Sequence, residues 1–181
     1  MAIKPKLKIA TTSLAGCFGC HMSFLDMDER LEELFEQVEF DRSPFTDIKQ
    51  CGPCDIGLIE GGVCNAENVQ VLREFRAQCT TLVAVGACAI NGGVPALRNY
   101  FDVQDCLNEV YLSGIGVSDP QIPSDPELPL LLDKVYAVSE VVFIDYFLPG
   151  CPPSAEDFLQ LLEPLLIGQT PMLSKSHLRY D

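Results

Sequence analysis

Short runs of strand-forming residues alternate along this chain with longer amphipathic stretches. Four runs have the length and composition of strands: residues 8–12, 55–59, 81–85 and 140–148. Three stretches repeat their apolar residues at helical spacing and begin at residues that cap helices: Ser23, Asn65 and Ser154. Strands that alternate with helices are typical of parallel sheets covered on both faces. The pattern therefore predicts an α/β, flavodoxin-like three-layer fold with a mostly parallel sheet of about four strands.

Two segments depart from this alternation. Residues 92–112 have helical or mixed character, and residues 113–129 carry four prolines, which exclude regular helix or sheet. We expect this proline-rich loop to contact a partner, together with the polar tail 168–181. We find no internal repeat, so residues 1–181 are expected to form a single domain.

Composition narrows the possible functions. The net charge of -14, with only 12 lysines and arginines, argues against nucleic-acid binding, which needs clustered positive charge. The sequence contains no run of about 18 apolar residues and so predicts no membrane span. The first residues do not resemble an export signal, and we expect a cytoplasmic protein.

Nine cysteines are more than a chain of this size needs for stability, and their odd number indicates metal or redox chemistry. Cys17, Cys20, Cys88 and Cys151 each lie a few residues beyond the carboxyl end of a predicted strand. The carboxyl ends of parallel strands meet at one edge of the sheet, where ligands bind in such folds. We therefore expect these four thiols to converge.

The other five cysteines are expected elsewhere. Cys51 and Cys54 precede the strand 55–59, which at about 3.3 Å per residue holds them about 16 Å from the opposite edge. A redox-switched role for this pair stays open. Cys64 follows the same strand and is the competing candidate ligand, whereas Cys79 and Cys106 are expected to be buried small hydrophobic residues.

Four thiolates without a histidine partner fit either zinc or an iron-sulfur cluster, and spacing alone does not decide between them. His21 is expected at a helix entry or a protein interface rather than as a ligand. Helices that begin after Cys20 and Cys151 would direct backbone amides at the site and favour its negative charge. This arrangement suits both kinds of metal centre.

Four motifs together resemble a known family: residues 16–23, 58–62, 86–93 and 148–153. They resemble the small subunit of nickel-iron hydrogenases and its relatives, a superfamily that includes the 20-kDa-type subunit of NADH-quinone oxidoreductase. The resemblance extends from about Lys8 to Leu166. Within the superfamily, the chain is most similar to the small hydrogenase subunit of soluble, bidirectional NAD(P)-reducing hydrogenases. Three features carry this resemblance: the two-residue gap between Cys17 and Cys20, the short region after the last motif and the lack of an export signal.

The resemblance implies a specific function. Cys17, Cys20, Cys88 and Cys151 would bind one 4Fe-4S cluster, proximal to the nickel-iron site of a separate large subunit. Electrons would pass between hydrogen oxidation or proton reduction and a diaphorase module of iron-sulfur and flavin subunits. No catalytic residue of this chain is implied. Glu60, with a capping or a proton-path role, and His21 are candidates for contacts around the ligands.

Three alternatives remain at the level of sequence. The chain could serve an F420-reducing, formate-linked or sulfhydrogenase complex, or it could be a zinc-stabilised interaction protein. It could also be a flavin-binding (FMN) redox module. Against flavin, the loop 12–17 leads into a cysteine where a flavodoxin would cradle phosphate with hydroxyl groups.

Overall fold

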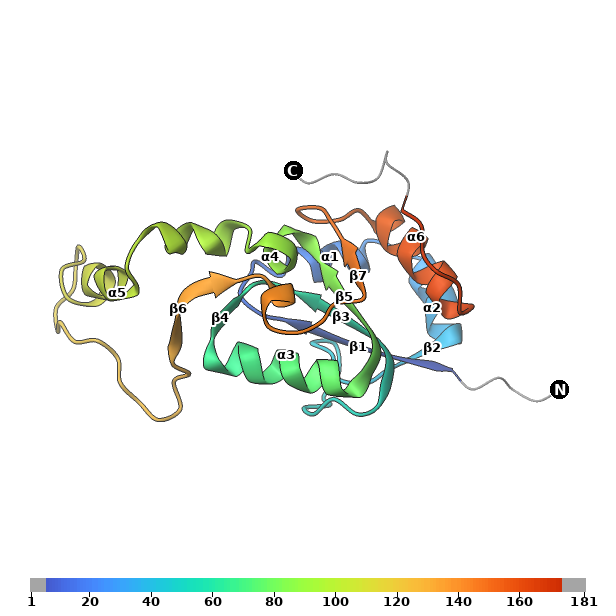
Figure 1. Cartoon of the computed structure of the whole chain (residues 1–181), viewed down its shortest axis with the longest axis horizontal. Helices are drawn as coiled ribbons and strands as arrows, with labels where there is room; N and C mark the ends of the chain where they lie inside the picture. Colours follow the sequence, from blue (N-terminus) through green and yellow to red (C-terminus); the bar gives the residue numbers. More distant parts are fainter. Residues whose placement is uncertain (1–5, 174–181) are drawn as a thin grey trace.

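The computed structural model describes residues 6–173 and contains a sheet of five parallel strands (Figure 1). In spatial order the strands are β2 (Val38–Phe40), β1 (Leu7–Ser13), β3 (Cys54–Glu60), β5 (Cys79–Val85) and β7 (Tyr146–Leu148). The α/β class and the parallel sheet predicted from the sequence are confirmed. The strand beyond the predicted four is β2.

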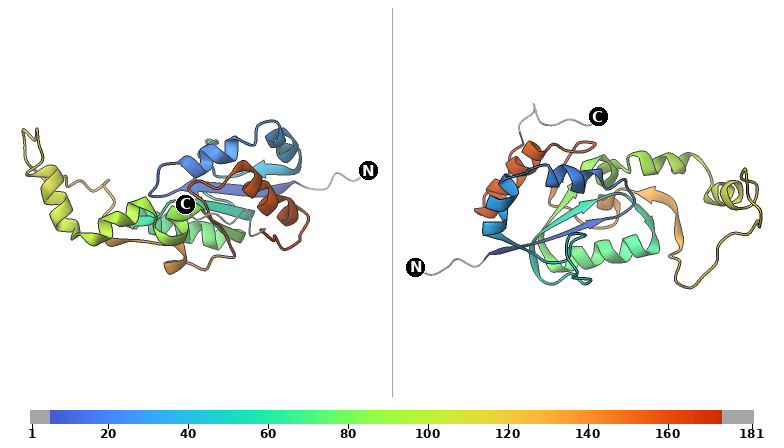
Figure 2. Two further views of the ribbon diagram at one scale, coloured as in Figure 1. Left: turned by 90° about the horizontal axis from the view of Figure 1, so that it is seen from above. Right: turned by 180° about the vertical axis from the view of Figure 1, so that it is seen from behind.

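Helices cover both faces of the sheet, which gives the predicted three layers. One face packs against α1 (Gly19–Leu25), α2 (Arg30–Gln37) and α6 (Ala155–Leu166). The other packs against α3 (Ala66–Gln78), α4 (Gly86–Asn91) and the 3-10 turn η2 (Val138–Glu140). Figure 2 shows α2 and α3 on opposite sides of the strands.

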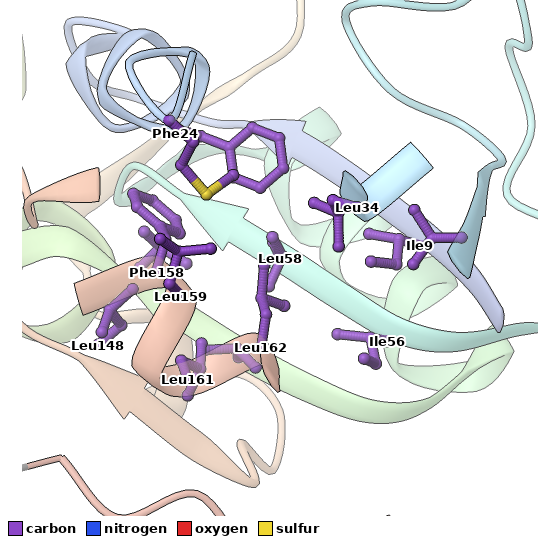
Figure 3. Close-up of a cluster of buried hydrophobic side chains, with 14 of the residues drawn as sticks. Ile9, Phe24, Leu34, Ile56, Leu58, Leu148, Phe158, Leu159, Leu161 and Leu162 are labelled. Carbon is purple, nitrogen blue, oxygen red and sulfur yellow. The ribbon is translucent and has the colours of Figure 1, made fainter. Parts of the chain in front are cut away.

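The core on the first face is built from alternate strand residues and one stripe of each helix (Figure 3). Ile56 and Leu58 of β3 point to this face, while Ile59 packs on the other with Leu72 and Phe75 of α3. Side chains of a strand alternate between the two faces, so a nearly all-apolar strand supplies both cores.

Two predicted helix starts are confirmed by their capping contacts. The Asn65 side chain accepts a hydrogen bond from the backbone N–H of Asn68 at 2.8 Å. Ser154 and Asp157 form a reciprocal capping box at the start of α6. Each contact satisfies a backbone donor that the first helical turn leaves without a partner.

The helix predicted to start at Ser23 is wrong in its bounds. α1 begins at Gly19 and ends at Leu25, and a turn with Asp28 in a left-handed conformation (φ 51°) separates it from α2. The Ser23 hydroxyl donates to the carbonyl of Pro153 and therefore ties α1 to the segment before α6. A serine followed by an acidic residue three positions later resembles a cap, but here tertiary contacts decide its role.

The strand predicted over 140–148 is also wrong in its extent, because only Tyr146–Leu148 pairs with β5. Asp145 marks the point where the chain joins the sheet: its backbone N–H donates to the carbonyl of Leu82, and its carboxylate accepts from Leu82 N and Arg76. An antiparallel pair, β4 (Val63–Asn65) and β6 (Leu131–Tyr136), was not predicted.

An arm extends from the sheet on the side of α4 (Figure 1). It contains η1 (Val94–Tyr100), α5 (Val103–Tyr111) and the irregular residues 112–130 that lead to β6. The helical character predicted for 92–112 and the irregular course of 113–129 are confirmed. Of the predicted polar tail, residues 174–181 lie outside the described residues.

In the part of the chain that the structure describes, no helix has the length and apolar character needed to cross a membrane.

Candidate metal centre

A hollow at the carboxyl-terminal edge of the sheet brings together four cysteines from three parts of the chain. Its walls are formed by glycines, Glu60, Ala87, Pro152 and the four thiol-bearing residues, Cys17, Cys20, Cys88 and Cys151. Cys17 and Cys20 follow β1, Cys88 follows β5, and Cys151 follows β7. The structure thus places in one site the four cysteines that the sequence predicted to converge.

Cys88 differs from the prediction in its local structure. It lies within α4, a helix of six residues, rather than in a loop. This helix starts at Gly86 directly after β5, so the short connection turns the chain back across the hollow. The consequence for the site is the same, because Cys88 still faces the hollow.

The remaining cysteines do not line this hollow. Cys64 directs both its backbone N–H and its thiol to the side-chain oxygen of Asn68. Cys51 and Cys54 lie at the amino end of β3, and Cys79 is buried at the amino end of β5. Cys106, predicted to be buried, is partly exposed on α5, a helix with no buried residue.

Two of the thiols, those of Cys20 and Cys88, occupy space that a side chain at Gly86 or Gly93 would fill. A Cβ at Gly86 would overlap the Cys20 sulfur, and this residue has a left-handed conformation (φ 79°). A Cβ at Gly93 would lie 2.8 Å from the Cys88 sulfur. Glycine alone provides both the backbone conformation and the room at position 86.

The spacing of the thiols bears on which metal centre they suit. A single tetrahedral zinc ion, with Zn–S bonds of about 2.3 Å, holds its sulfur ligands about 3.8 Å apart. Within residues 6–173, the thiols of the hollow form no group of three with ligand atoms within 4.8 Å of one another. Four thiols at wider separation fit a larger inorganic core, such as an iron-sulfur cluster, better than one ion.

Glu60 connects the hollow to a buried chain of hydrogen bonds. Its carboxylate accepts from the backbone N–H of Cys20 at 3.0 Å and lies 2.7 Å from Nδ1 of His21. Nε2 of His21 lies 2.9 Å from the hydroxyl of Thr11, which contacts the hydroxyl of Ser43 at 2.8 Å. All except Cys20 are buried.

These contacts bear on the expected roles of Glu60 and His21. Glu60 accepts a hydrogen bond from a backbone donor in the first turn of α1, which is a capping contact, and its proton-path role stays a prediction. His21 belongs to the entry of α1, as predicted, but it is buried and stacks on the ring of Phe18 rather than facing an interface. Thr11 and Ser43 were not predicted, because a threonine inside a strand and a serine in a polar stretch give no functional signal.

Two thiols of the hollow have raised pKa values. Burial, followed by the negative charge of Glu60, raises the pKa of the Cys20 thiol far above its ordinary value. Burial also raises the pKa of Cys88. Burial alone would raise the pKa of Glu60, but its hydrogen bond to His21 and other donors lower it overall. Without a cation the buried thiols hold their protons, and metal binding would release them.

Residues 17–165 match the family described as NADH ubiquinone oxidoreductase, 20 Kd subunit. The chain belongs to this family. The match includes all four cysteines of the hollow, and it confirms the superfamily that the sequence motifs resemble.

Within this family, individual relatives match nearly the whole chain. It is 47% identical over 180 residues to the NAD-reducing hydrogenase HoxS subunit delta of Cupriavidus necator, covering 97% of this chain and 86% of the relative. It is 34% identical over 178 residues to a subunit of the F420-non-reducing hydrogenase of Methanothermobacter marburgensis, covering 96% of this chain and 58% of that protein.

Solved structures agree with this relationship. A chain in the crystal structure of an NAD+-reducing [NiFe]-hydrogenase in the H2-reduced state is 57% identical and superimposes with a TM-score of 0.96, covering 98% of this chain and 100% of that chain. A Ni-Fe-Se hydrogenase of Desulfomicrobium baculatum, 15% identical with a TM-score of 0.58, shares the fold.

Proposed function

We propose that this chain is the electron-transfer subunit of an NAD(P)-reducing nickel-iron hydrogenase complex. Cys17, Cys20, Cys88 and Cys151 would hold one 4Fe-4S cluster, the one proximal to a nickel-iron site in a separate large subunit. The observation that carries the proposal is the convergence of these four thiols in a chain similar along nearly its full length to one from an NAD+-reducing [NiFe]-hydrogenase.

The chain's own residues position and shield the centre. Cys20 and Cys88 are partly buried, whereas Cys17 and Cys151 are exposed, so one side of the hollow is open. Gly86 and Gly93 leave room beside two of the sulfurs, and Glu60 fixes the backbone at Cys20. When bound, the cluster would supply one-electron transfer, and its potential would depend on burial, nearby charge and hydrogen bonds to sulfur.

The open side implies the partner. Its lip, at Cys17 and Cys151, would be covered by the large subunit, so that electrons pass over a short, dry path. The diaphorase subunits would then exchange these electrons with NAD(P) in the cytoplasm. The catalytic residues belong to the partners in this proposal, and this chain conducts electrons between them.

Cysteine variants test the cluster assignment. We expect serine at Cys17, Cys20, Cys88 or Cys151 to abolish the paramagnetic signal of the reduced proximal cluster in the purified complex. Alanine at Cys51 or Cys54, at the other end of β3, is expected to leave that signal. A native signal in any variant of the first group would overturn the assignment of that residue.

Isolation of the complex tests the electron acceptor. We expect a tagged chain to co-purify with a large nickel-binding subunit and with flavin-containing NAD(P)-binding subunits. Recovery of F420-binding subunits in place of the diaphorase would assign the chain to a different hydrogenase complex. A flavin spectrum from the chain alone, without iron, would favour the flavin-module alternative.

A further inference from the structure

A second group of metal-ligating side chains lies at the opposite end of β3 from the hollow. Ligand atoms of Asp41, Cys51 and Cys54 all lie within 4.8 Å of one another. Cys54 opens β3 and is the register partner of Cys79, which opens β5. Cys54 and Glu60 are the two ends of β3, which at about 3.3 Å per residue places this group about 20 Å from the hollow.

The group is held in place by the backbone. One oxygen of the Asp41 carboxylate accepts hydrogen bonds from the N–H groups of Arg42 and Gly52, both at 2.8 Å. The N–H of Cys51 donates to Glu74 on α3 at 2.8 Å. Both the carboxylate and the turn Cys51-Gly52-Pro53-Cys54 are therefore oriented before any ligand binds.

Close approach of the turn to the carboxylate depends on the glycine. A Cβ at Gly52 would lie 3.1 Å from the second oxygen of Asp41, Oδ2, which is tighter than ordinary contact. Oδ1 already accepts two backbone bonds, so Oδ2 keeps its capacity to bind a cation.

We propose that Asp41, Cys51 and Cys54, completed by Cys79, form a closed structural site for one divalent ion of the zinc class. Zinc takes thiolate and carboxylate ligands, and its structural sites are four-coordinate and closed to solvent. Binding would replace the protons of three thiols, which pass to solvent, so that three thiolates and one carboxylate surround the dication.

The burial of the three thiols argues against a role in thiol-disulfide exchange. Cys51, Cys54 and Cys79 are exposed by only 6%, 5% and 4%. Exchange requires an accessible thiolate, which these residues do not supply. The compact spacing of Asp41, Cys51 and Cys54 also suits one ion, toward which Cys79, the register partner of Cys54, would turn its thiol.

The site would fasten a segment that has no regular structure. Residues 41–53 contain neither helix nor strand, and their two ends meet at Asp41 and at Cys51-Cys54. A metal bridge here would tie this segment to the amino ends of β3 and β5. Its role would be structural and independent of electron transfer.

Zinc analysis of the purified complex tests this proposal. We expect the native complex to contain about one zinc ion more for each copy of this chain than the Cys54→Ser complex, while the matched variant Cys106→Ser retains the native zinc content. Zinc held by other subunits cancels in this difference. Iron and acid-labile sulfide should be the same in all three, which separates this result from the cluster assignment.

Equal zinc in the native and Cys54→Ser complexes would overturn the proposal. A disulfide between Cys51 and Cys54 in the native chain would also overturn it. Mass spectrometry after alkylation under denaturing conditions without reductant would show this disulfide as two unlabelled cysteines with two hydrogens fewer. If Cys54→Ser fails to assemble, Asp41→Asn is the second variant to test, because asparagine keeps the side-chain oxygen that accepts the two backbone hydrogen bonds. We expect this variant to lose zinc to a chelator about tenfold faster than the native complex, and an unchanged rate would refute the site.

Discussion

At the scale of single residues, Glu60 illustrates what the sequence could and could not provide. The family resemblance made it a candidate, with a capping or a proton-path role. The structure shows the capping contact of Glu60 to Cys20. His21 lies at the helix entry, as expected, but it is buried against Glu60 and does not face an interface. Contacts between residues 39 positions apart depend on how strand and helix pack, which no local pattern encodes.

Loss of the Glu60 carboxylate is expected to destabilise the chain. Glu60→Ala leaves the Cys20 N–H and His21 Nδ1 without their partner inside the core, at a cost of about 3 kcal/mol in the free energy of unfolding. Glu36→Ala, at an exposed position of α2, is the matched control and should change it by less than about 0.5 kcal/mol. Denaturant titration of both variants measures the difference, and equal stability would contradict the role assigned to Glu60.

The lowered pKa of Glu60 also predicts a dependence on pH. Its folded-state pKa lies below the ordinary value of 4.5, so its contribution to stability is complete above that value and is lost as the pH falls toward the folded pKa. The stability advantage of the native chain over Glu60→Gln should therefore be constant near neutral pH and shrink in acid. An advantage that grows as the pH falls would contradict this sign.

At the scale of elements, the positions of strand ends determined which cysteines could meet. Strand runs such as 81–85 were predictable because buried parallel strands are nearly all apolar, and the caps at Asn65 and Ser154 were predictable because their contacts are local. The start of α1 and the extent of β7 were not, since Ser23 and Asp145 direct their polar groups to tertiary partners. The convergence of the four cysteines could be predicted because it depends only on where the strands end.

The turn from β5 into α4 gives a prediction at this scale. Gly86→Ala introduces a Cβ that overlaps the Cys20 sulfur, so we expect loss of the cluster and of the bound iron. Gly116→Ala is the matched control, because Gly116 has a similar left-handed conformation (φ 87°) with no atom within 4 Å of the added Cβ. It should cost only about 1 kcal/mol in stability and retain the iron. Iron retained by Gly86→Ala would contradict the close packing at this turn.

At the scale of the whole molecule, the arm is the feature that suits a subunit of a larger complex. It extends from the sheet after α4, the helix that carries Cys88 (Figures 1 and 2). It exposes large apolar side chains, among them Tyr100 and Phe101, which are 82% and 68% exposed. Prolines predicted that residues 113–129 would be irregular. They could not predict the arm, because its shape depends on where η1, α5 and β6 pack.

The arm predicts a defect in assembly without a defect in the metal centre. Replacing both Tyr100 and Phe101 with serine should reduce co-purification of partner subunits, since aromatic side chains contribute strongly to interfaces. Ile48→Ser, at an exposed position of segment 41–53 outside the arm, should assemble normally. Quantitative pull-down from cells that express all subunits measures this, and undiminished recovery of the double variant would exclude this part of the arm from the interface.

Whether the hollow holds a 4Fe-4S cluster is tested by the iron and acid-labile sulfide content of the purified complex, compared between the native chain and Cys151→Ser. We expect the variant to lack about four iron and four sulfide for each copy of this chain. A difference of one zinc ion, with no difference in sulfide, would contradict the proposal that the hollow holds an iron-sulfur cluster.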